Sequence, residues 1–268
     1  MALKAAASLV VTAPRTALHG STASQASAFD YGVLMVRRRS GGSFGSAWVF
    51  PGGAIEPLDQ LYPDAPSACA IRETFEETGL LLADTPTAGE LDPQHLHDAA
   101  QRDPLLGTRL LARWVTPRAQ KTRFDTRFLL LNLARPNACL DRLHAVQLQT
   151  SEVVDLDWFA PDQLLRANQQ LPLYPPQLHL FFELARFKKQ AMLCDAKRLG
   201  CSDVVEPVLA SRNDGKVVAL LPGDHAYSLA RPPPNEHLYA DKLKPLHRLE
   251  MSPAAGGFLG AQLFQTTL

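Results

Sequence analysis

One short segment constrains this 268-residue chain more strongly than any other. A helix over residues 67–78 would begin near Pro66, which suits a first helical turn, and stop at Gly79, which suits a helix end. At 100° per residue, its apolar and acidic residues separate onto opposite sides. The segment therefore predicts a helix with one face in a core and one acidic face. The apolar side holds Ala68, Ile71 and Phe75, and the acidic side holds Glu73, Glu76 and Glu77.

The acidic face carries like charges three and four residues apart, which repel one another even in water. Arg72 stands beside them and can reach Glu76 one turn further along. A solvated acidic surface is the ordinary outcome of such a pattern. The functional alternative is a metal site, because clustered carboxylates are ligands that Mg²⁺ and Mn²⁺ prefer.

The residues around these glutamates decide between the two interpretations. Residues 72–80 read RETFEETGL, which matches the R-E-U-x-E-E-x-G-U core of the Nudix box, where U is an aliphatic residue. A glycine pair precedes this core, and Thr74 is its one loose position. The chain therefore resembles the Nudix hydrolases. The resemblance implies that Arg72, Glu73, Glu76 and Glu77 are catalytic, that the three glutamates bind Mg²⁺ or Mn²⁺, and that Arg72 holds a glutamate in place.

The box is interrupted in this chain. Its usual form, G-x5-E-x7-R, has 13 residues between the glycine and the arginine, whereas Gly53 and Arg72 enclose 18. Five extra residues therefore lie inside the motif, in the loop before the helix. Glu56, Asp59 and Asp64 are each candidates for its first glutamate, and the sequence leaves that choice open.

An interrupted box of this kind resembles the peroxisomal-type acyl-coenzyme A diphosphatases. The resemblance implies an α/β fold, a Nudix-type α/β/α sandwich with a mixed sheet. It also implies a Nudix hydrolase domain over residues 5–170, with the insertion in its box. Residues 171–268 would form a C-terminal helical and hairpin extension packed on the same domain. The supporting motifs are Phe50–Gly53, Trp114–Pro117, Arg123–Phe128, Trp158–Pro161, Leu171–Gln177 and Leu221–Asp224.

The implied reaction is metal-dependent hydrolysis of a diphosphate bond in a small nucleotide-derived substrate. For this subfamily, the substrate is coenzyme A or an acyl-CoA, and the products are 3′,5′-ADP and 4′-phosphopantetheine or its acyl form. The same chemistry on ADP-ribose, dinucleoside polyphosphates or RNA caps is an alternative. A catalytically inactive Nudix fold that binds a ligand is an alternative of another class.

Several residues are candidates for substrate binding. Gly52 and Gly53 let the backbone approach the helix and leave amide hydrogens for a phosphate or a metal-bound water. A strand over residues 123–128 would put Arg123, Asp125 and Arg127 on one side and Phe124, Thr126 and Phe128 on the other. If the polar side faces the cleft, Arg123 and Arg127 bind an anionic group; otherwise that side faces solvent. Arg37, in the arginine run 37–39, is a further candidate for binding an anionic group. Trp114 and Trp158 either stack on adenine or pack in the core.

Composition narrows the choice of partners. The chain has 27 Lys and Arg against 27 Asp and Glu, so its formal net charge is zero, and bulk attraction to nucleic acid is not expected. No apolar run approaches the roughly 20 residues of a membrane-spanning helix. The four cysteines lack the close spacing of a disulfide framework or a zinc site, and His95 and His97 face different directions.

Location and oligomeric state stay open. The first 29 residues contain no Asp or Glu, a feature of transit peptides, but residues 5–12 equally suit a buried first strand, which we favour. The resemblance implies a peroxisome, yet the chain ends in QTTL rather than in a Ser-Lys-Leu signal. Cytoplasmic and mitochondrial locations are the alternatives. The other expected elements are a strand over 31–37, helices over 161–168 and 176–199, and a hairpin of 204–209 with 216–221.

Overall fold

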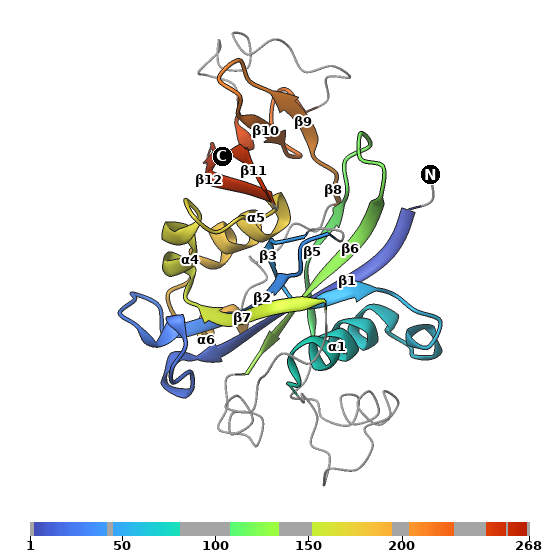
Figure 1. Cartoon of the computed structure of the whole chain (residues 1–268), viewed down its shortest axis with the longest axis vertical. Helices are drawn as coiled ribbons and strands as arrows, with labels where there is room; N and C mark the ends of the chain where they lie inside the picture. Colours follow the sequence, from blue (N-terminus) through green and yellow to red (C-terminus); the bar gives the residue numbers. More distant parts are fainter. Residues whose placement is uncertain are drawn as a thin grey trace, which may run out of the picture.

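The computed structural model describes residues 3–41, 45–80, 108–133, 152–194, 204–227, 245–255 and 257–266. A large mixed sheet forms its centre, and helices cover both faces of that sheet (Figure 1). Helix α1 (Ala65–Thr78) lies against one face, whereas α4 (Pro161–Ala167) and α5 (Pro175–Leu184) lie against the other. This arrangement confirms the α/β fold expected from the sequence.

The central sheet has eight strands in the order β3-β2-β1-β6-β5-β8, with β4 paired to β1 and β7 paired to β2. The pairs β1–β6 and β5–β8 are parallel, and the others are antiparallel. The sheet is therefore mixed. Its strands are β1 (Leu3–Pro14), β2 (Tyr31–Arg38), β3 (Trp48–Val49), β4 (Gly52–Ala54), β5 (Arg109–Val115), β6 (Arg123–Asn132), β7 (Val153–Phe159) and β8 (Val204–Val205).

A second sheet of four antiparallel strands lies beyond α5, at the top of Figure 1. Of this sheet, the sequence predicted only the hairpin of residues 204–209 with 216–221. Its second strand corresponds to β10, whereas its first is divided between β8, which joins the central sheet, and the start of β9. The sheet consists of β9 (Val208–Ser211), β10 (Val217–Leu220), β11 (His247–Ala254) and β12 (Gly257–Gln265). The short helices are η1 (Arg15–Ala17), η2 (Thr22–Ser24), η3 (Asp59–Leu61) and α6 (Ala191–Cys194).

Two other expectations about the chain need comment. The helix predicted over residues 176–199 is too long, because α5 ends at Leu184 and a separate short helix, α6, follows. Residues 195–199 of that prediction, together with His95, His97, Cys139 and Cys201, lie outside the described residues. The division of the chain at residue 170 stays a prediction.

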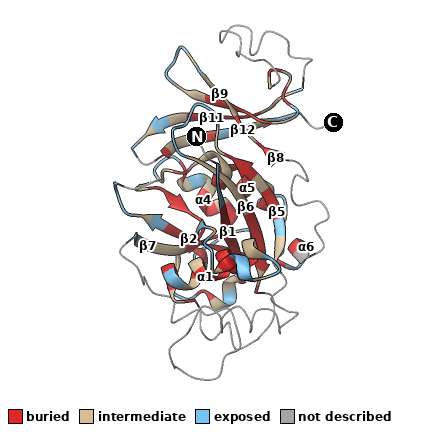
Figure 2. Ribbon diagram, turned by 90° about the vertical axis from the view of Figure 1, so that its right-hand side faces the viewer, coloured by how far each residue is buried: buried red, intermediate tan, exposed pale blue. Residues whose placement is uncertain are grey.

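Apolar side chains of the central sheet pack into two cores, one on each face of the sheet. Figure 2 shows that most residues of these strands are buried. Leu9 and Val11 of β1 pack on the α1 side, whereas Val10 between them packs on the α5 side. This alternation follows from the two-residue period of a strand. Strand β6 divides in the same way, so the two cores hold β1 and β6 rigidly beside α1. None of the described helices is long and apolar enough to cross a membrane.

Local sequence explains why α1 starts and stops where it does. The Asp64 carboxylate caps the first turn by accepting a bond from the Ser67 hydroxyl at 2.5 Å, and its side chain also accepts from the Ser67 amide. Gly79 ends the helix with a left-handed φ of 67°, and its amide donates to the carbonyl of Phe75. Thr74, the loose position of the motif, is buried, and its hydroxyl donates to the Ala70 carbonyl at 2.7 Å. A threonine is therefore accommodated without an unpaired hydroxyl.

Helix α1 has the expected core face at Ala68 and Ile71, but its acidic face is largely covered. Glu77 is only 2% exposed, and Glu73 is half-buried, so of the three glutamates only Glu76 is exposed. Phe75, expected in the core, is half-buried. These glutamates are covered because the chain before the helix folds back over the acidic side. The helical period of the sequence does not predict this cover.

A buried histidine pair lies where α5 meets the second sheet. The ring centroid of His179 is 5.6 Å from that of His247 and 5.5 Å from that of Trp114. Burial, together with the neighbouring His247, lowers the pKa of His179 to about 3. The folded protein therefore holds His179 in its neutral form at physiological pH.

We expect His179 to make the protein less stable as the pH falls. Above a pH of 6.5 the side chain is neutral in both states, but between 6.5 and about 3 the unfolded chain binds a proton that the folded protein does not. His179→Gln should therefore flatten the decrease in the free energy of unfolding across this window, as measured by urea denaturation at a series of pH values. His19→Gln, which replaces an exposed histidine, should keep the wild-type slope. Equal slopes in all three proteins would contradict the expectation.

Candidate active site

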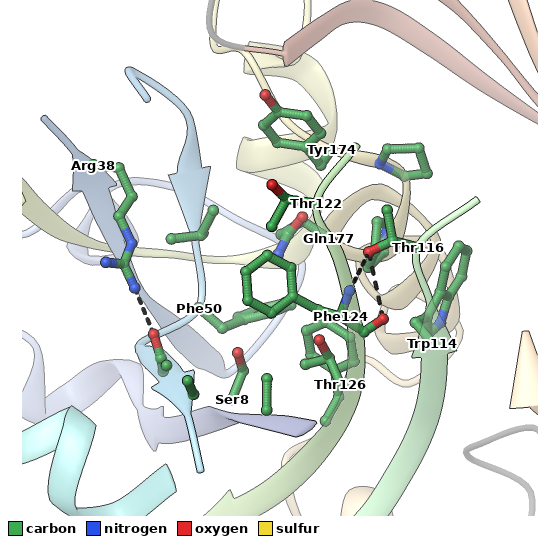
Figure 3. Close-up of a pocket in the computed structure, with 18 of the residues that line it drawn as sticks. Ser8, Arg38, Phe50, Trp114, Thr116, Thr122, Phe124, Thr126, Tyr174 and Gln177 are labelled. Carbon is green, nitrogen blue, oxygen red and sulfur yellow. Dashed lines mark hydrogen bonds between the residues drawn. The ribbon is translucent and has the colours of Figure 1, made fainter. Parts of the chain in front are cut away.

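A cavity of about 1050 Å³ opens beside α1, and most of the Nudix-box residues named above line it. One part of its wall comes from α1 and β4, and the remainder comes from β5, β6, the start of α5 and the second sheet. In Figure 3, Arg38 points to the glycine strand at one side, and Phe124, Trp114 and Tyr174 line the other. The wall beside α1 and β4 includes Arg38, Gly52, Gly53, Arg72, Glu73, Glu76 and Glu77.

Arg72 is the centre of a buried network of charges. Its guanidinium donates to both carboxylate oxygens of Asp59, with Nε at 3.0 Å and Nη2 at 2.9 Å. Its Nη1 donates to Glu73 at 3.0 Å and to Glu76 at 3.1 Å. Arg72 is 6% exposed and Asp59 is 2% exposed, so water screens this network little. Because one rigid cation holds three carboxylates, it fixes the orientation of the acidic face.

The structure distinguishes the three acids that the sequence left open. Asp59 pairs with Arg72, whereas Asp64 caps α1 and Glu56 is exposed. Asp59 also accepts a bond from the amide of Glu56 at 2.8 Å, which closes the turn before η3. The inserted residues therefore place an aspartate, not a glutamate, against the arginine of the box.

Glu77 is held by a second arginine. Its Oε1 lies 2.8 Å from Arg38 Nη2, and its Oε2 accepts a bond from the Gly52 amide at 3.1 Å. Arg38 also donates to the Gly52 carbonyl and to Glu152, the latter at 3.0 Å. Burial raises the pKa of Glu77 to about 7, and the Arg38 charge offsets this only in part. The sequence pointed to Arg37 instead, because a charge run does not show which member turns inward.

The glycine pair allows the strand to pass close to the acidic helix. A Cβ on Gly53 would lie 2.2 Å from Glu73 Oε1, and a Cβ on Gly52 would lie 2.4 Å from the Ala7 carbonyl oxygen. Any side chain at either position would therefore displace its neighbours. The expected close approach of backbone to helix is observed at Gly53, whereas Gly52 comes close to β1. The Gly52 amide is occupied by Glu77 rather than left for a phosphate.

The acidic face does not form a ready-made metal centre. Among the described residues, no three carboxylate, imidazole or thiol groups converge in an arrangement that would hold a metal ion. The contacts give the reason, because Glu73 and Glu76 turn toward Arg72 and Glu77 turns toward Arg38.

The chemistry of these donors still fits a divalent cation. Burial raises the pKa of Glu73 as well as that of Glu77, although both carboxylates have an arginine beside them. The two arginines therefore do not fully offset the loss of water around the carboxylates, and added positive charge would stabilise their ionised forms. Oxygen donors of this kind suit Mg²⁺ or Mn²⁺. Metal binding by Glu73, Glu76 and Glu77 stays a prediction.

The arginines predicted to bind substrate lie elsewhere. Phe124, Thr126 and Phe128 face the cavity, so Arg123 and Arg127 project from the other side of β6. Arg123 donates to Glu206 at 2.7 Å and to the Thr116 carbonyl at 2.9 Å. Arg37 is exposed and lies 3.9 Å from Asp155. Arg37, Arg123 and Arg127 therefore do not line this cavity, and their role in substrate binding stays a prediction. For β6, alternation identifies the two sides of the strand but not which one faces the cavity.

The two tryptophans occupy core positions. Trp158 is 4% exposed and packs in the core on the α1 side. Trp114 is 3% exposed, packs on the α5 side and also contributes to the cavity wall. Core packing, one of the two roles predicted from the sequence, is therefore confirmed for both.

Comparisons with known proteins bear on this site. A family model described as NUDIX domain matches residues 23–181. A protein of Xenopus laevis named acyl-coenzyme A diphosphatase NUDT19 is 27% identical, over 74% of this chain and 72% of that protein. The human protein of the same name is 30% identical, over 59% of this chain and 50% of that protein.

A solved structure is also similar. The crystal structure of a NUDIX hydrolase from Alicyclobacillus acidocaldarius has a TM-score of 0.55 and 26% sequence identity, and the match covers 75% of this chain and 99% of that one. The match therefore extends to the arrangement of the chain in space as well as to its sequence.

Three matched variants should separate the roles of the three acids. Asp59→Asn leaves the Arg72 charge with one partner fewer in a buried place, so we expect the free energy of unfolding to fall by about 2–3 kcal/mol. Asp64→Asn should change it by less than about 0.5 kcal/mol, because asparagine caps a helix as well as aspartate does. Glu56→Gln, at an exposed position, should also have little effect. Urea denaturation checks all three, and an Asp59→Asn protein as stable as the other two would contradict the network.

Proposed function

The chain belongs to the Nudix family, whose hydrolases act on pyrophosphate bonds, and on this premise we propose that its substrate is coenzyme A or an acyl-CoA. The products would be 3′,5′-ADP and 4′-phosphopantetheine or its acyl form. Support for this substrate comes from the similarity to proteins named acyl-coenzyme A diphosphatase. The five extra residues in the box are a second resemblance to that group.

One observation carries the proposal. Arg72 holds Glu73 and Glu76 at the wall of a cavity of about 1050 Å³, beside a strand that only glycines allow to come so close. Ligand pockets commonly enclose about 300–1,000 Å³, so this cavity is large enough for a long substrate. A dinucleotide-sized molecule with an extended arm fits that size better than a small phosphate ester.

The residues of the site have separable tasks in this proposal. A bound Mg²⁺ or Mn²⁺ would polarise the phosphoryl oxygens and make a water molecule more nucleophilic. Glu73, Glu76 and Glu77 would hold it. Arg72 fixes the first two of these carboxylates, and its guanidinium is already paired with Asp59, Glu73 and Glu76. Arg38 lies at the cavity wall and offsets the charge of Glu77, so it is the arginine placed to meet an anionic substrate.

The substrate can be tested directly. Purified protein with Mg²⁺ or Mn²⁺ should be offered coenzyme A, octanoyl-CoA, ADP-ribose, diadenosine tetraphosphate and capped RNA, with the products separated by chromatography. We expect the highest kcat/KM for the coenzyme A compounds, with 3′,5′-ADP as a product. A higher kcat/KM for ADP-ribose would contradict the proposed substrate, and turnover of none of the compounds would support an inactive fold.

The acidic residues can be tested by substitution. Glu73→Gln, Glu76→Gln and Glu77→Gln each remove one charged oxygen donor and should lower kcat by about 100-fold or more, because metal stabilisation of such a reaction amounts to several kcal/mol. Each variant should retain its fold by circular dichroism. Glu183→Gln on α5, whose carboxylate pairs with Arg186 on the surface, is the matched control and should keep wild-type kcat. Wild-type rates in all three site variants would show that this face is not the metal site.

A further inference from the structure

Part of the cavity wall comes from chain outside the region that matches the family. The match ends at residue 181, yet Pro207, Leu209 and Phe258, all from the second sheet or the chain leading to it, line the cavity. We propose that these residues form an acyl wall, which binds the acyl chain of a thioester substrate. The inference rests on the proposed function, because it assigns one half of the acyl-CoA to a particular surface.

The acyl wall is fixed to the catalytic part of the molecule. The amide of Leu173 donates to the Phe258 carbonyl at 3.0 Å, and the amide of Phe258 donates back at 2.9 Å. A Cβ on Gly257 would lie 2.9 Å from the Leu173 carbonyl oxygen, so a larger residue would force the two segments apart. The ring of Tyr174 meets that of Phe258 edge-on, with centroids 6.1 Å apart. The second sheet is therefore joined to the segment that opens α5, and the next residues of that segment line the same cavity.

The chemistry of the acyl wall excludes the charged half of the substrate. Leu209 and Phe258 are half-buried, pack against the main core and carry no polar atom in their side chains. Glu206, next to Pro207, is already paired with Arg123 at 2.7 Å. A 3′-phosphate carries charge that these apolar side chains cannot compensate. Arg118 and Arg123, the arginines beside Glu206, are already paired with it, so burying the phosphate there would be unfavourable. The pantetheine and acyl half has no such charge, and its methylenes gain from contact with apolar side chains.

The two halves of the substrate would then leave the acidic face in different directions. Helix α1 covers one side of the central sheet, and the second sheet lies beyond α5 on the other side (Figure 1). The diphosphate has to lie at Glu73, Glu76 and Glu77 to be cleaved. From there the uncharged arm reaches the acyl wall, and the phosphorylated adenosine lies away from it.

The test measures binding without turnover. In EDTA, the Kd values of coenzyme A, butanoyl-CoA and octanoyl-CoA would be measured by calorimetry, with each ligand below its micelle concentration. Each buried methylene strengthens binding up to about fourfold, so we expect octanoyl-CoA to bind at least about tenfold more tightly than butanoyl-CoA. Leu209→Trp, which fills the cavity, should reduce this ratio to about twofold. Leu209→Ala, a smaller change in case the tryptophan disturbs folding, should reduce it to below about fivefold.

Val208→Ala is the matched control. Val208 lies on the same strand but packs into a separate apolar cluster with Val218 and Leu220, away from the cavity. It should keep the wild-type ratio, and thermal unfolding shows that all three variants are folded. An unchanged ratio in both Leu209 variants, or a wild-type ratio near one, would overturn the acyl wall.

Turnover of free coenzyme A with Mg²⁺ is measured in parallel and tests the proposed function alone. Hydrolysis of coenzyme A without any dependence of binding on chain length would leave the function standing and overturn the acyl wall. Chain-length-dependent binding that Leu209→Trp abolishes, without hydrolysis, would support the acyl wall and contradict the proposed reaction.

Discussion

The ion pair between Arg72 and Asp59 is the interaction on which the site depends. Both side chains are almost completely buried, and a buried charge is stable only when it is paired. Asp59 uses both oxygens on one edge of the guanidinium, which leaves the other edge for Glu73 and Glu76. The extra residues in the box therefore do not prevent an acid from pairing with its arginine. They form the turn and the short helix η3 that bring an acid back to the arginine.

Electrostatics explains why this site should respond to a cation. Glu77 is nearly inaccessible to water, and its pKa stays raised although Arg38 and a glycine amide contact it. Protein groups thus hold the carboxylates in place without neutralising them completely. In the proposed function, a divalent cation bound here would stabilise the ionised forms of these carboxylates. The zero net charge of the whole chain is consistent with this proposal, because a cation bound at the site would attract an anionic ligand locally.

Sequence reasoning succeeded where short-range rules decide the outcome. Pro66 and Gly79 mark the ends of α1 through backbone geometry, and β1 and β2 follow from apolar runs. It failed where the answer depends on what packs against an element. The alternation of β6 separates Arg123 from Phe124 correctly, but only the position of α5 and the second sheet makes the aromatic side face the cavity. Likewise, nothing local distinguishes Arg38 from Arg37, or shows that Glu77 is covered by the glycine strand.

In our proposals, catalysis and substrate selectivity are assigned to different parts of the chain. The residues that would bind metal lie on α1, within the part of the chain that matches the family, whereas Leu209 and Phe258 come from strands that follow it. Because the Leu173–Phe258 bridge fixes these strands to the start of α5, a substitution in β9 or β12 can reshape the cavity without moving the acidic helix. The Arg72 network and the acyl wall share no side chain, so changes in one should add to changes in the other rather than couple with them.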